Sequence, residues 1–167
     1  QAKLLGLVPY GISFHVGSQQ KDIAVWDAAL SKVKYMFDWM RLEENVILKM
    51  INMGGGFPAN YISEVNPIQV YAEEILRYLS DDHGDEVPEI ILEPGRSLVG
   101  ESGVLVSEVV LISRKSRTDL KRWVYVDVGL FQGLIETMGE AIKYPIYTSK
   151  MEEGVQEGGV VLAGPTC

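Results

Sequence analysis

Apolar positions in the first part of the chain alternate between short runs that predict strands and periodic stretches that predict helices. Residues 11–16, 46–53 and 89–93 form three short, mostly apolar runs, each of which predicts a buried strand. After the first run, apolar side chains recur at three- and four-residue spacing, which predicts a helix with one buried face. The members of that face are Trp26, Leu30, Val33, Phe37 and Met40.

A second helix is predicted between the second and third strands. Asn66 is a natural N-cap. Pro67 fits the first helical position, because an N–H at that position forms no intrahelical hydrogen bond and proline has no N–H. Asp22 is the corresponding cap of the first helix. The expected buried face of the second helix consists of Ile68, Ala72, Ile75 and Leu79. Strands that alternate with helices predict a parallel sheet with crossover connections.

Candidate functional residues recur at the ends of the three predicted strands. His15, Gly54 and Glu93 follow one another at intervals of 39 residues. Ligands of α/β proteins bind at the carboxyl ends of parallel strands, so we expect these residues to line one site. Three strand–helix units are too few to close an eight-stranded barrel. The sheet is therefore either open and doubly wound or part of a barrel.

The pattern changes near residue 99. Residues 104–112, 123–128 and 160–163 are rich in β-forming side chains, and residues 130–143 predict one helix. The glycine-rich stretch at 154–159 predicts a turn between strands. We expect residues 1–98 to form one α/β domain and residues 99–167 to form part of a β domain.

Composition excludes some classes of protein. The 167 residues have a formal net charge of −8, whereas proteins that bind nucleic acids present basic surfaces. The apolar runs are too short to cross a membrane, and no signal peptide opens the chain, so we expect a cytoplasmic protein. The chain starts at Gln1, which fits a fragment. Cys167 is the single cysteine, so an internal disulfide is excluded.

Three motifs at the strand ends have candidate chemistry. Consecutive glycines at Gly54, Gly55 and Gly56 allow backbone N–H groups to approach an anion, although a tight turn is the simpler interpretation. No Lys-Ser/Thr pair follows them, which excludes a nucleotide P-loop, and no helix start follows, which argues against a dinucleotide-binding fingerprint.

The segment from Glu93 to Arg96 places a carboxylate and a guanidinium around a Pro-Gly corner. The pair could form a salt-bridged turn. Alternatively, Arg96 binds a phosphate through two nitrogens, and Glu93 faces a cationic ring nitrogen. Pyridoxal phosphate (PLP) requires both contacts. His15 could stack on such a planar ring while Ser18 binds the phosphate; a hydrogen-bonded core histidine is the alternative.

Together these motifs resemble the fold-type III PLP decarboxylases, which act on ornithine, lysine, arginine or diaminopimelate. The matching segments are FHVGSQ (14–19), NMGGGFP (52–58), EPGRSLVG (93–100), DVGLFQGLIETMGEAIKYP (127–145) and GPTC (164–167). The resemblance implies the C-terminal part of an alanine-racemase-like (β/α)8 barrel in residues 1–98, followed by part of the C-terminal β domain in residues 99–167.

The resemblance also implies roles for individual residues. His15 stacks on the PLP ring and Glu93 pairs with the pyridine nitrogen. The implied phosphate ligands are Ser18, Gly54, Gly55, Gly56 and Arg96. Cys167 is implied to protonate the decarboxylated intermediate across the interface of a head-to-tail homodimer.

The chain departs from the family pattern in three places. The motif of the family's Schiff-base lysine does not occur, and Lys49 lies in a different context, so we interpret Lys49 as structural. The acidic residue that usually follows the cysteine is missing after Cys167. Asn52 stands where many relatives have Asp, and no mechanistic role is predicted for it.

The motifs favour the ornithine/lysine branch, whose products are diamines for polyamine biosynthesis. Glu140 is the preferred carboxylate for the distal amine of the substrate, and Glu136 is the second candidate; both could instead lie on a solvated helix face. The alternatives are a diaminopimelate decarboxylase of lysine biosynthesis, or a non-catalytic decarboxylase homologue that acts as a binding partner. An amino-acid racemase and a phosphate-binding barrel enzyme without PLP are less compatible with the motifs.

Overall fold

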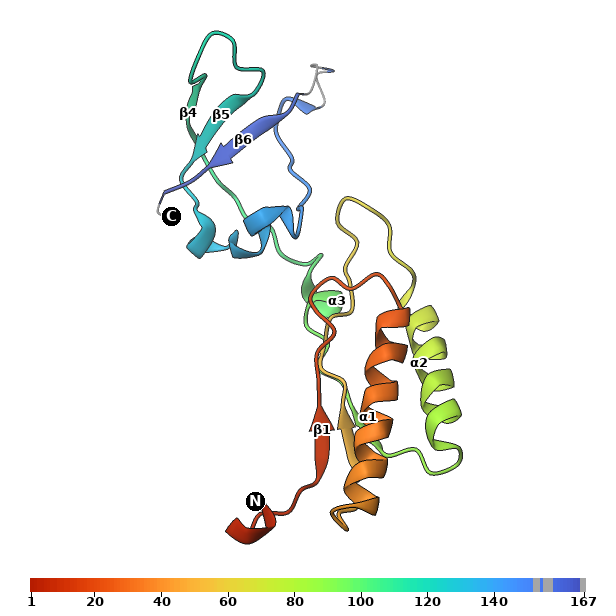
Figure 1. The fold of residues 1–167 in the computed structure, drawn as a ribbon. Coiled ribbons are helices and arrows are strands. Elements are labelled where there is room, and N and C mark those ends of the chain that lie inside the picture. Colours follow the sequence, from red (N-terminus) through yellow and green to blue (C-terminus); the bar gives the residue numbers. More distant parts are fainter. Residues whose placement is uncertain (152–153, 155–157, 166–167) are drawn as a thin grey trace. The chain divides into compact units, whose positions relative to one another are not determined.

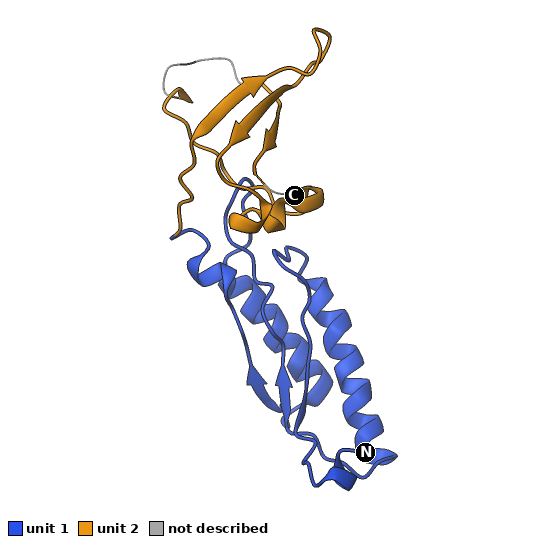
Figure 2. Ribbon diagram, turned by 90° about the vertical axis from the view of Figure 1, so that its left-hand side faces the viewer, with its two compact units in different colours: residues 1–102 blue, residues 103–167 orange. Residues whose placement is uncertain are grey.

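The computed structural model describes residues 1–151, 154 and 158–165. The chain divides into two compact units, residues 1–102 and residues 103–167 (Figure 2). In the described residues, no helix is both long enough and apolar enough to cross a membrane.

The first unit is built on a three-stranded parallel sheet, as predicted. Strands β1 (Gly11–Ser13), β2 (Met50–Asn52) and β3 (Glu89–Ile91) lie in the order β1-β2-β3. The strands are shorter than predicted: β1 ends at Ser13, β2 begins at Met50, and β3 ends at Ile91. Hydrogen bonds nevertheless continue beyond them, from Met53 N–H to the Ile91 carbonyl at 2.9 Å.

Two helices cover one face of this sheet and lie side by side (Figure 1). Helix α1 (Ala24–Leu42) connects β1 to β2, and α2 (Ile68–His83) connects β2 to β3. Ile51 of β2 faces the helices and is fully buried. The buried core consists of Trp26, Leu30, Val33, Ile51, Met53, Phe57, Tyr71, Ile75 and Leu79. The apolar face predicted for α1 is therefore confirmed at Trp26, Leu30 and Val33, which are buried, and at Phe37, which is half-buried against the core.

The prediction for α2 was wrong in its start and in the first half of its buried face, whereas the burial of Ile75 and Leu79 is confirmed. Pro67 is the cap rather than the first helical residue, and Ile68 is 50% exposed. Tyr71 takes the buried position instead of Ala72, because its ring packs edge-on against Trp26, with 5.6 Å between the ring centroids. An aromatic side chain buries far more apolar area than alanine, so the helix turns Tyr71 inward.

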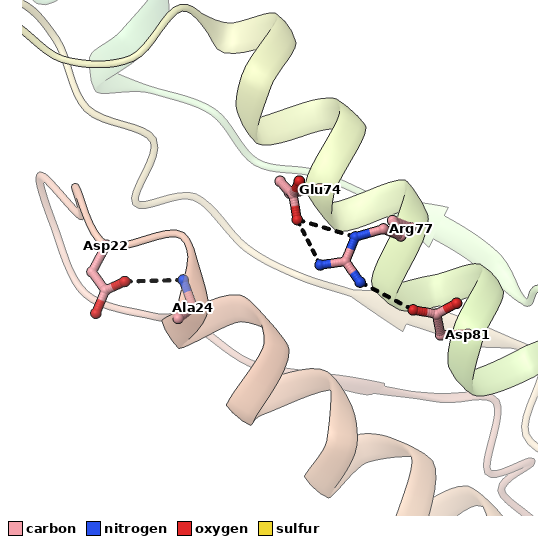
Figure 3. Close-up of polar contacts among 5 residues, drawn as sticks. All are labelled: Asp22, Ala24, Glu74, Arg77 and Asp81. Carbon is pink, nitrogen blue, oxygen red and sulfur yellow. Dashed lines mark hydrogen bonds and ion pairs between the residues drawn. The ribbon is translucent and has the colours of Figure 1, made fainter.

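Polar side chains define the helix start and the outer surface (Figure 3). The Asp22 carboxylate accepts the N–H of Ala24, the first residue of α1, at 3.0 Å, but Ile23 is the cap residue, so the predicted cap was one residue too early. On the exposed side of α2, Arg77 bridges Glu74 at 2.7 Å and Asp81 at 3.2 Å. Such i,i+3 and i,i+4 pairs stabilise a helix by only a few tenths of a kcal/mol each, about 0.2–0.5.

The short helix α3 (Arg96–Val99) follows the Pro-Gly corner after β3, and a 3-10 helix, η1 (Lys3–Leu5), lies near the N-terminus. The second unit contains strands β4 (Val109–Ser113), β5 (Arg122–Val126) and β6 (Val160–Ala163) in the order β4-β5-β6. Strands β4 and β5 are antiparallel, whereas β5 and β6 are parallel.

Two predictions for the second unit were wrong. The single helix expected at residues 130–143 is replaced by two 3-10 segments, η2 (Leu130–Gln132) and η3 (Ile135–Glu140). Gly133 and Gly139 have φ angles of 125° and 64°, which interrupt a right-handed helix. The strand expected from residue 104 begins only at Val109. Residues 155–157 of the turn predicted at 154–159 lie outside the described residues.

Candidate functional site

One pocket of about 550 Å³ lies at the carboxyl ends of β1, β2 and β3. It is formed within the first unit. Its lining residues are Ser13, Phe14, His15, Ser18, Gln19, Asn52, Gly54, Gly55, Gly56, Glu93, Gly95 and Arg96. All seven candidate residues that the sequence analysis placed in the first unit are therefore brought together.

The strand register explains why these residues meet. Gly11 pairs with Met50, and Met50 pairs with Glu89, so the sequence interval between paired residues is 39 in both cases. Extended past the strands, the same register aligns His15, Gly54 and Glu93. The N–H of Glu93 donates to the carbonyl of Gly54 at 2.7 Å, which ties the second and third loops together.

The glycine triplet allows the three loops to approach closely. A Cβ atom on Gly55 would lie 2.6 Å from the backbone oxygen of Glu93, and one on Gly54 would lie 2.5 Å from that of Phe14. Gly54 and Gly56 also have φ angles of 64° and 97°, which disfavour other residues. A Cβ atom on Gly54 would also lie 3.3 Å from Nδ1 of His15, so the imidazole lies beside the triplet.

The Arg96 guanidinium reaches across the pocket from α3. Its Nη2 donates to the hydroxyl of Ser18 at 2.9 Å, and its Nη1 donates to the hydroxyl of Tyr61 at 3.1 Å. The guanidinium also lies 5.9 Å from the centre of the Tyr61 ring. A cation and a hydroxyl are thus positioned together on one side of the pocket, as binding of a phosphate requires.

The Glu93 carboxylate is bonded to β2. Oδ1 of Asn52 accepts the N–H of Gly54 at 2.9 Å, and Nδ2 of Asn52 donates to Oε1 of Glu93. The Glu93 carboxylate is thus hydrogen-bonded to Asn52, and the Arg96 guanidinium is hydrogen-bonded to Ser18 and Tyr61. This arrangement favours separate ligand contacts over the alternative of a salt-bridged turn.

Gln19 joins the first and second loops through its side-chain amide. Its Nε2 donates to the carbonyl of Ala59 at 2.7 Å, and its Oε1 accepts the N–H of the same residue at 3.1 Å. Gln19 has a φ angle of 54°, an unusual conformation for a residue with a side chain. This reciprocal pair fixes the loop that contains Ser18 against the loop that follows the glycines.

The pocket fits the requirements of a phosphorylated, cationic aromatic ring. A guanidinium, a hydroxyl and close-packed glycine backbone lie within it, together with an imidazole and a carboxylate. The volume is within the range of small-molecule and cofactor sites. These are the groups that PLP needs for its phosphate, its ring face and its ring nitrogen.

The candidates of the second unit have local contacts. Glu136 accepts a hydrogen bond from the Tyr144 hydroxyl at 3.1 Å. Glu140 pairs with Nζ of Lys143 at 2.9 Å, and the hydrogen bond from this lysine lowers the pKa of the carboxyl below its usual value. Its side chain is 80% exposed, so an ionised carboxylate is presented to solvent. Cys167 lies outside the described residues.

Lys49 lies at the opposite end of the sheet from the pocket. Its N–H donates to the carbonyl of Tyr10 at 2.8 Å, and its carbonyl accepts the N–H of Glu89 at 2.9 Å, both at the start of the strands. The backbone of Lys49 therefore belongs to the sheet ladder, in agreement with a structural interpretation.

The sequence analysis missed roles for Asn52, Gln19 and Tyr61. A signal existed for Asn52. Its register partner in β3 is Ile91, and side chains two residues apart on a strand point to the same face, so Asn52 and Glu93 could have been placed on one side of the sheet. Gln19 and Tyr61 lie in loops without a period, so no pattern in the sequence indicated their contacts.

The parallel sheet and the pocket at its carboxyl edge define an α/β cofactor-binding protein. The family model described as "Pyridoxal-dependent decarboxylase, pyridoxal binding domain" matches residues 1–100. The chain belongs to this family, and its cofactor is therefore PLP, as expected from the motifs.

Known proteins with similar sequences include diaminopimelate decarboxylases. The chain is 30% identical over 162 residues to a diaminopimelate decarboxylase of Bacillus subtilis, covering 94% of the chain and 36% of the relative. It is 32% identical over 169 residues to the Archaeoglobus fulgidus enzyme of the same name, covering 99% of the chain and 39% of the relative. The chain thus spans well under half the length of these curated relatives.

Solved structures with a similar fold belong to both branches of the family. A lysine/ornithine decarboxylase from Vibrio vulnificus complexed with putrescine has a TM-score of 0.74 and 29% identity, with 99% of the chain and 43% of that structure covered. A diaminopimelate decarboxylase from Helicobacter pylori complexed with L-lysine has a TM-score of 0.68 and 29% identity, with 96% and 38% covered. The three strands and two helices of the first unit fit part of such a barrel.

Proposed function

We propose that the protein containing this chain is a PLP-dependent carboxy-lyase that removes the α-carboxylate of an amino acid with a second amino group. The observation that supports this proposal is the meeting of Glu93, Arg96, Ser18, His15 and the glycine triplet in one pocket. Bound PLP would withdraw electrons from the α-carbon through its protonated ring, so that the carboxylate leaves as CO₂.

Each residue of the pocket has a distinct task in this proposal. Arg96 and Ser18 bind the phosphate, and the close backbone approach at the glycine triplet leaves room for it. Glu93 holds a proton on the ring nitrogen, because an adjacent carboxylate favours the cationic form. His15 packs against the ring face. Cys167 donates a proton to the α-carbon from the other subunit of a homodimer.

For the substrate, we propose meso-diaminopimelate first and lysine or ornithine second. The curated relatives described above, which are diaminopimelate decarboxylases, favour the first substrate. The GPTC segment and the structural similarity to a lysine/ornithine decarboxylase favour the second. Glu140 is the proposed contact for a distal ammonium group, since its exposed carboxylate remains ionised.

CO₂ release by the full-length protein tests this function. The protein is incubated with PLP and, separately, with diaminopimelate, lysine, ornithine and arginine. We expect release from one of the first three, together with an absorbance band near the visible edge of the spectrum. Failure to bind PLP, or absence of CO₂ release from all four, would reject the proposal.

The role of Glu93 has its own test. The full-length Glu93→Gln variant should retain PLP, because the phosphate contacts are intact, but lose most of its turnover. The amide of glutamine has no negative charge to keep the ring nitrogen protonated. Turnover close to that of the unsubstituted protein would contradict this assignment.

A further inference from the structure

The side chain of Asn52 donates a hydrogen bond to the Glu93 carboxylate, and both residues line the pocket. It lies at the end of β2, and its side chain is half-buried between the glycine triplet and the third loop. Nothing in the motif pattern assigns it a task. Its contacts nevertheless determine how the neighbouring carboxylate is held.

The orientation of the Asn52 amide is fixed by the backbone. The N–H of Gly54 can only donate, so the atom of Asn52 that faces it at 2.9 Å must be the oxygen. The amide nitrogen then points to Oε1 of Glu93 and donates to it. An aspartate would keep the first bond but offer a second carboxylate to Glu93 instead of a donor. The observed pair therefore specifically requires the amide.

The bond from Asn52 occupies Oε1 of Glu93 and leaves Oε2 for a contact with a ligand. Glu93 lies on a loop just beyond β3 and is exposed, so its side chain would otherwise sample several rotamers. Asn52 is on a strand and is itself held by Gly54, which makes it a rigid support. A carboxylate held at Oε1 presents Oε2 in a defined direction.

We infer that Asn52 is a positioning residue that holds Glu93 in the orientation needed to meet the ring nitrogen of PLP. The inference rests on the proposed function, since it requires the cofactor ring in this pocket. Asn52 does not itself contact the ring nitrogen in this proposal. It acts through Glu93, and loss of its amide should weaken the recognition of that nitrogen alone.

The test compares two cofactors that differ only at the ring nitrogen. One is PLP and the other is its analogue with carbon in place of that nitrogen; both retain the aldehyde, hydroxyl and phosphate. The dissociation constant of each is measured with the full-length protein without cofactor. The preference for PLP is the dissociation constant of the analogue divided by that of PLP.

Asn52→Leu should lower this preference by about tenfold, which is the lower range for loss of a hydrogen bond to a charged group. Affinity for the analogue should change less than twofold, because the phosphate contacts of Arg96 and Ser18 remain. In an E93Q background, N52L should have little further effect on the preference. The same shift measured with Asn52→Ala supports the inference if the leucine variant does not fold.

Asn60→Leu is the matched control. Asn60 also accepts a backbone N–H, that of Val65 at 3.1 Å, but it does not line this pocket. Its substitution should leave the preference for PLP unchanged. A change equal to that of N52L would show a general effect on the loops and overturn the inference.

The remaining outcomes are equally decisive. If N52L weakens both cofactors by the same factor, Asn52 has a structural role only, and the inference is overturned. If N52L changes neither constant, it is also overturned. If the unsubstituted protein binds neither cofactor, the proposed function itself fails, which is distinguishable because no preference can then be measured.

Discussion

Arg96 is bonded to side chains from two different loops, Ser18 from the first and Tyr61 from the second. This arrangement depends on the planar fork of the guanidinium, which presents its two terminal nitrogens in fixed directions. Lysine has the same charge but a single ammonium group. We therefore expect the full-length Arg96→Lys variant to bind PLP about 10- to 100-fold more weakly, the range for loss of one charge-assisted hydrogen bond.

Fluorescence titration with PLP measures this effect, and Arg77→Lys is its control. Arg77 also contacts two partners, Glu74 and Asp81, but on the exposed surface of α2. Its substitution should leave PLP affinity unchanged. Equal affinities of the two variants would contradict the role of Arg96.

Asp127 makes part of the second unit sensitive to acid. Its carboxylate accepts the Ser107 hydroxyl at 2.7 Å and the Glu108 N–H at 2.9 Å, and these bonds lower its pKa below the usual value, the hydroxyl most. A lowered pKa in the folded state means that its stabilising contribution is complete above the unfolded value of about 4. The contribution is lost as the pH falls through the lower, folded value.

We therefore expect Asp127→Asn to reduce the melting temperature of the full-length protein at pH 6, with a difference that shrinks toward pH 2. Thermal melts at several pH values measure it. Asp85→Asn, in the exposed loop after α2, controls for the loss of one negative charge. A difference between D127N and the unsubstituted protein that does not vary with pH would contradict the prediction.

Sequence reasoning reached the residues of the pocket that belong to recognisable motifs, and it missed Asn52 as well as residues whose contacts depend on loop conformation. His15, Gly54 and Glu93 could be grouped because their spacing equals the strand register. Tyr61 and Gln19 could not, because their partners are set by three-dimensional loop paths. No periodic pattern in the sequence predicts such loop paths.

At the scale of elements, the three loops after the strands are packed so closely that one methyl group should disturb them. An added Cβ on Gly55 would meet the Glu93 backbone oxygen at 2.6 Å. Gly55→Ala should destabilise the full-length protein by about 1–3 kcal/mol, the usual cost of overpacking. The free energy of unfolding in urea measures this.

Gly103→Ala is the matched control for this experiment. No heavy atom lies within 4 Å of the Cβ that alanine would add there, among the atoms that the structure describes. Its effect should stay within about 0.5 kcal/mol. A G55A variant as stable as G103A would show that the loops can separate without cost.

Elements were predictable where apolar spacing dominates and unpredictable where local glycines or aromatic packing intervene. The face of α1 followed from its period, whereas the burial of Tyr71 in α2 depends on its tertiary contact with Trp26. The segment from Leu130 has helix-forming side chains, but Gly133 and Gly139 divide it. In that segment the backbone conformation of the two glycines therefore outweighs the helix propensity of the other residues.

At the scale of the whole molecule, the chain exposes more apolar and strand-edge surface than a stable monomer tolerates. Within the described residues, β1 and β3 each have one neighbouring strand. Val104 and Val106 are each 87% exposed, and Leu120 is 98% exposed. Such surfaces favour association with other chains.

We therefore expect the isolated 167-residue chain to unfold without a sharp transition and to self-associate. Circular dichroism during heating and sedimentation velocity measure the two properties. A sharp, cooperative melt of a monomeric species would contradict this expectation.

The reciprocal bonds between Gln19 and Ala59 have a thermodynamic consequence. Because they join two loops within the protein, most of the conformational freedom of these loops is already lost before any ligand arrives. Calorimetry should then record only a small unfavourable entropy of loop ordering on ligand binding. In a Gln19→Ala variant that unfavourable entropy should grow, although Gln19 has no assigned contact with the phosphate.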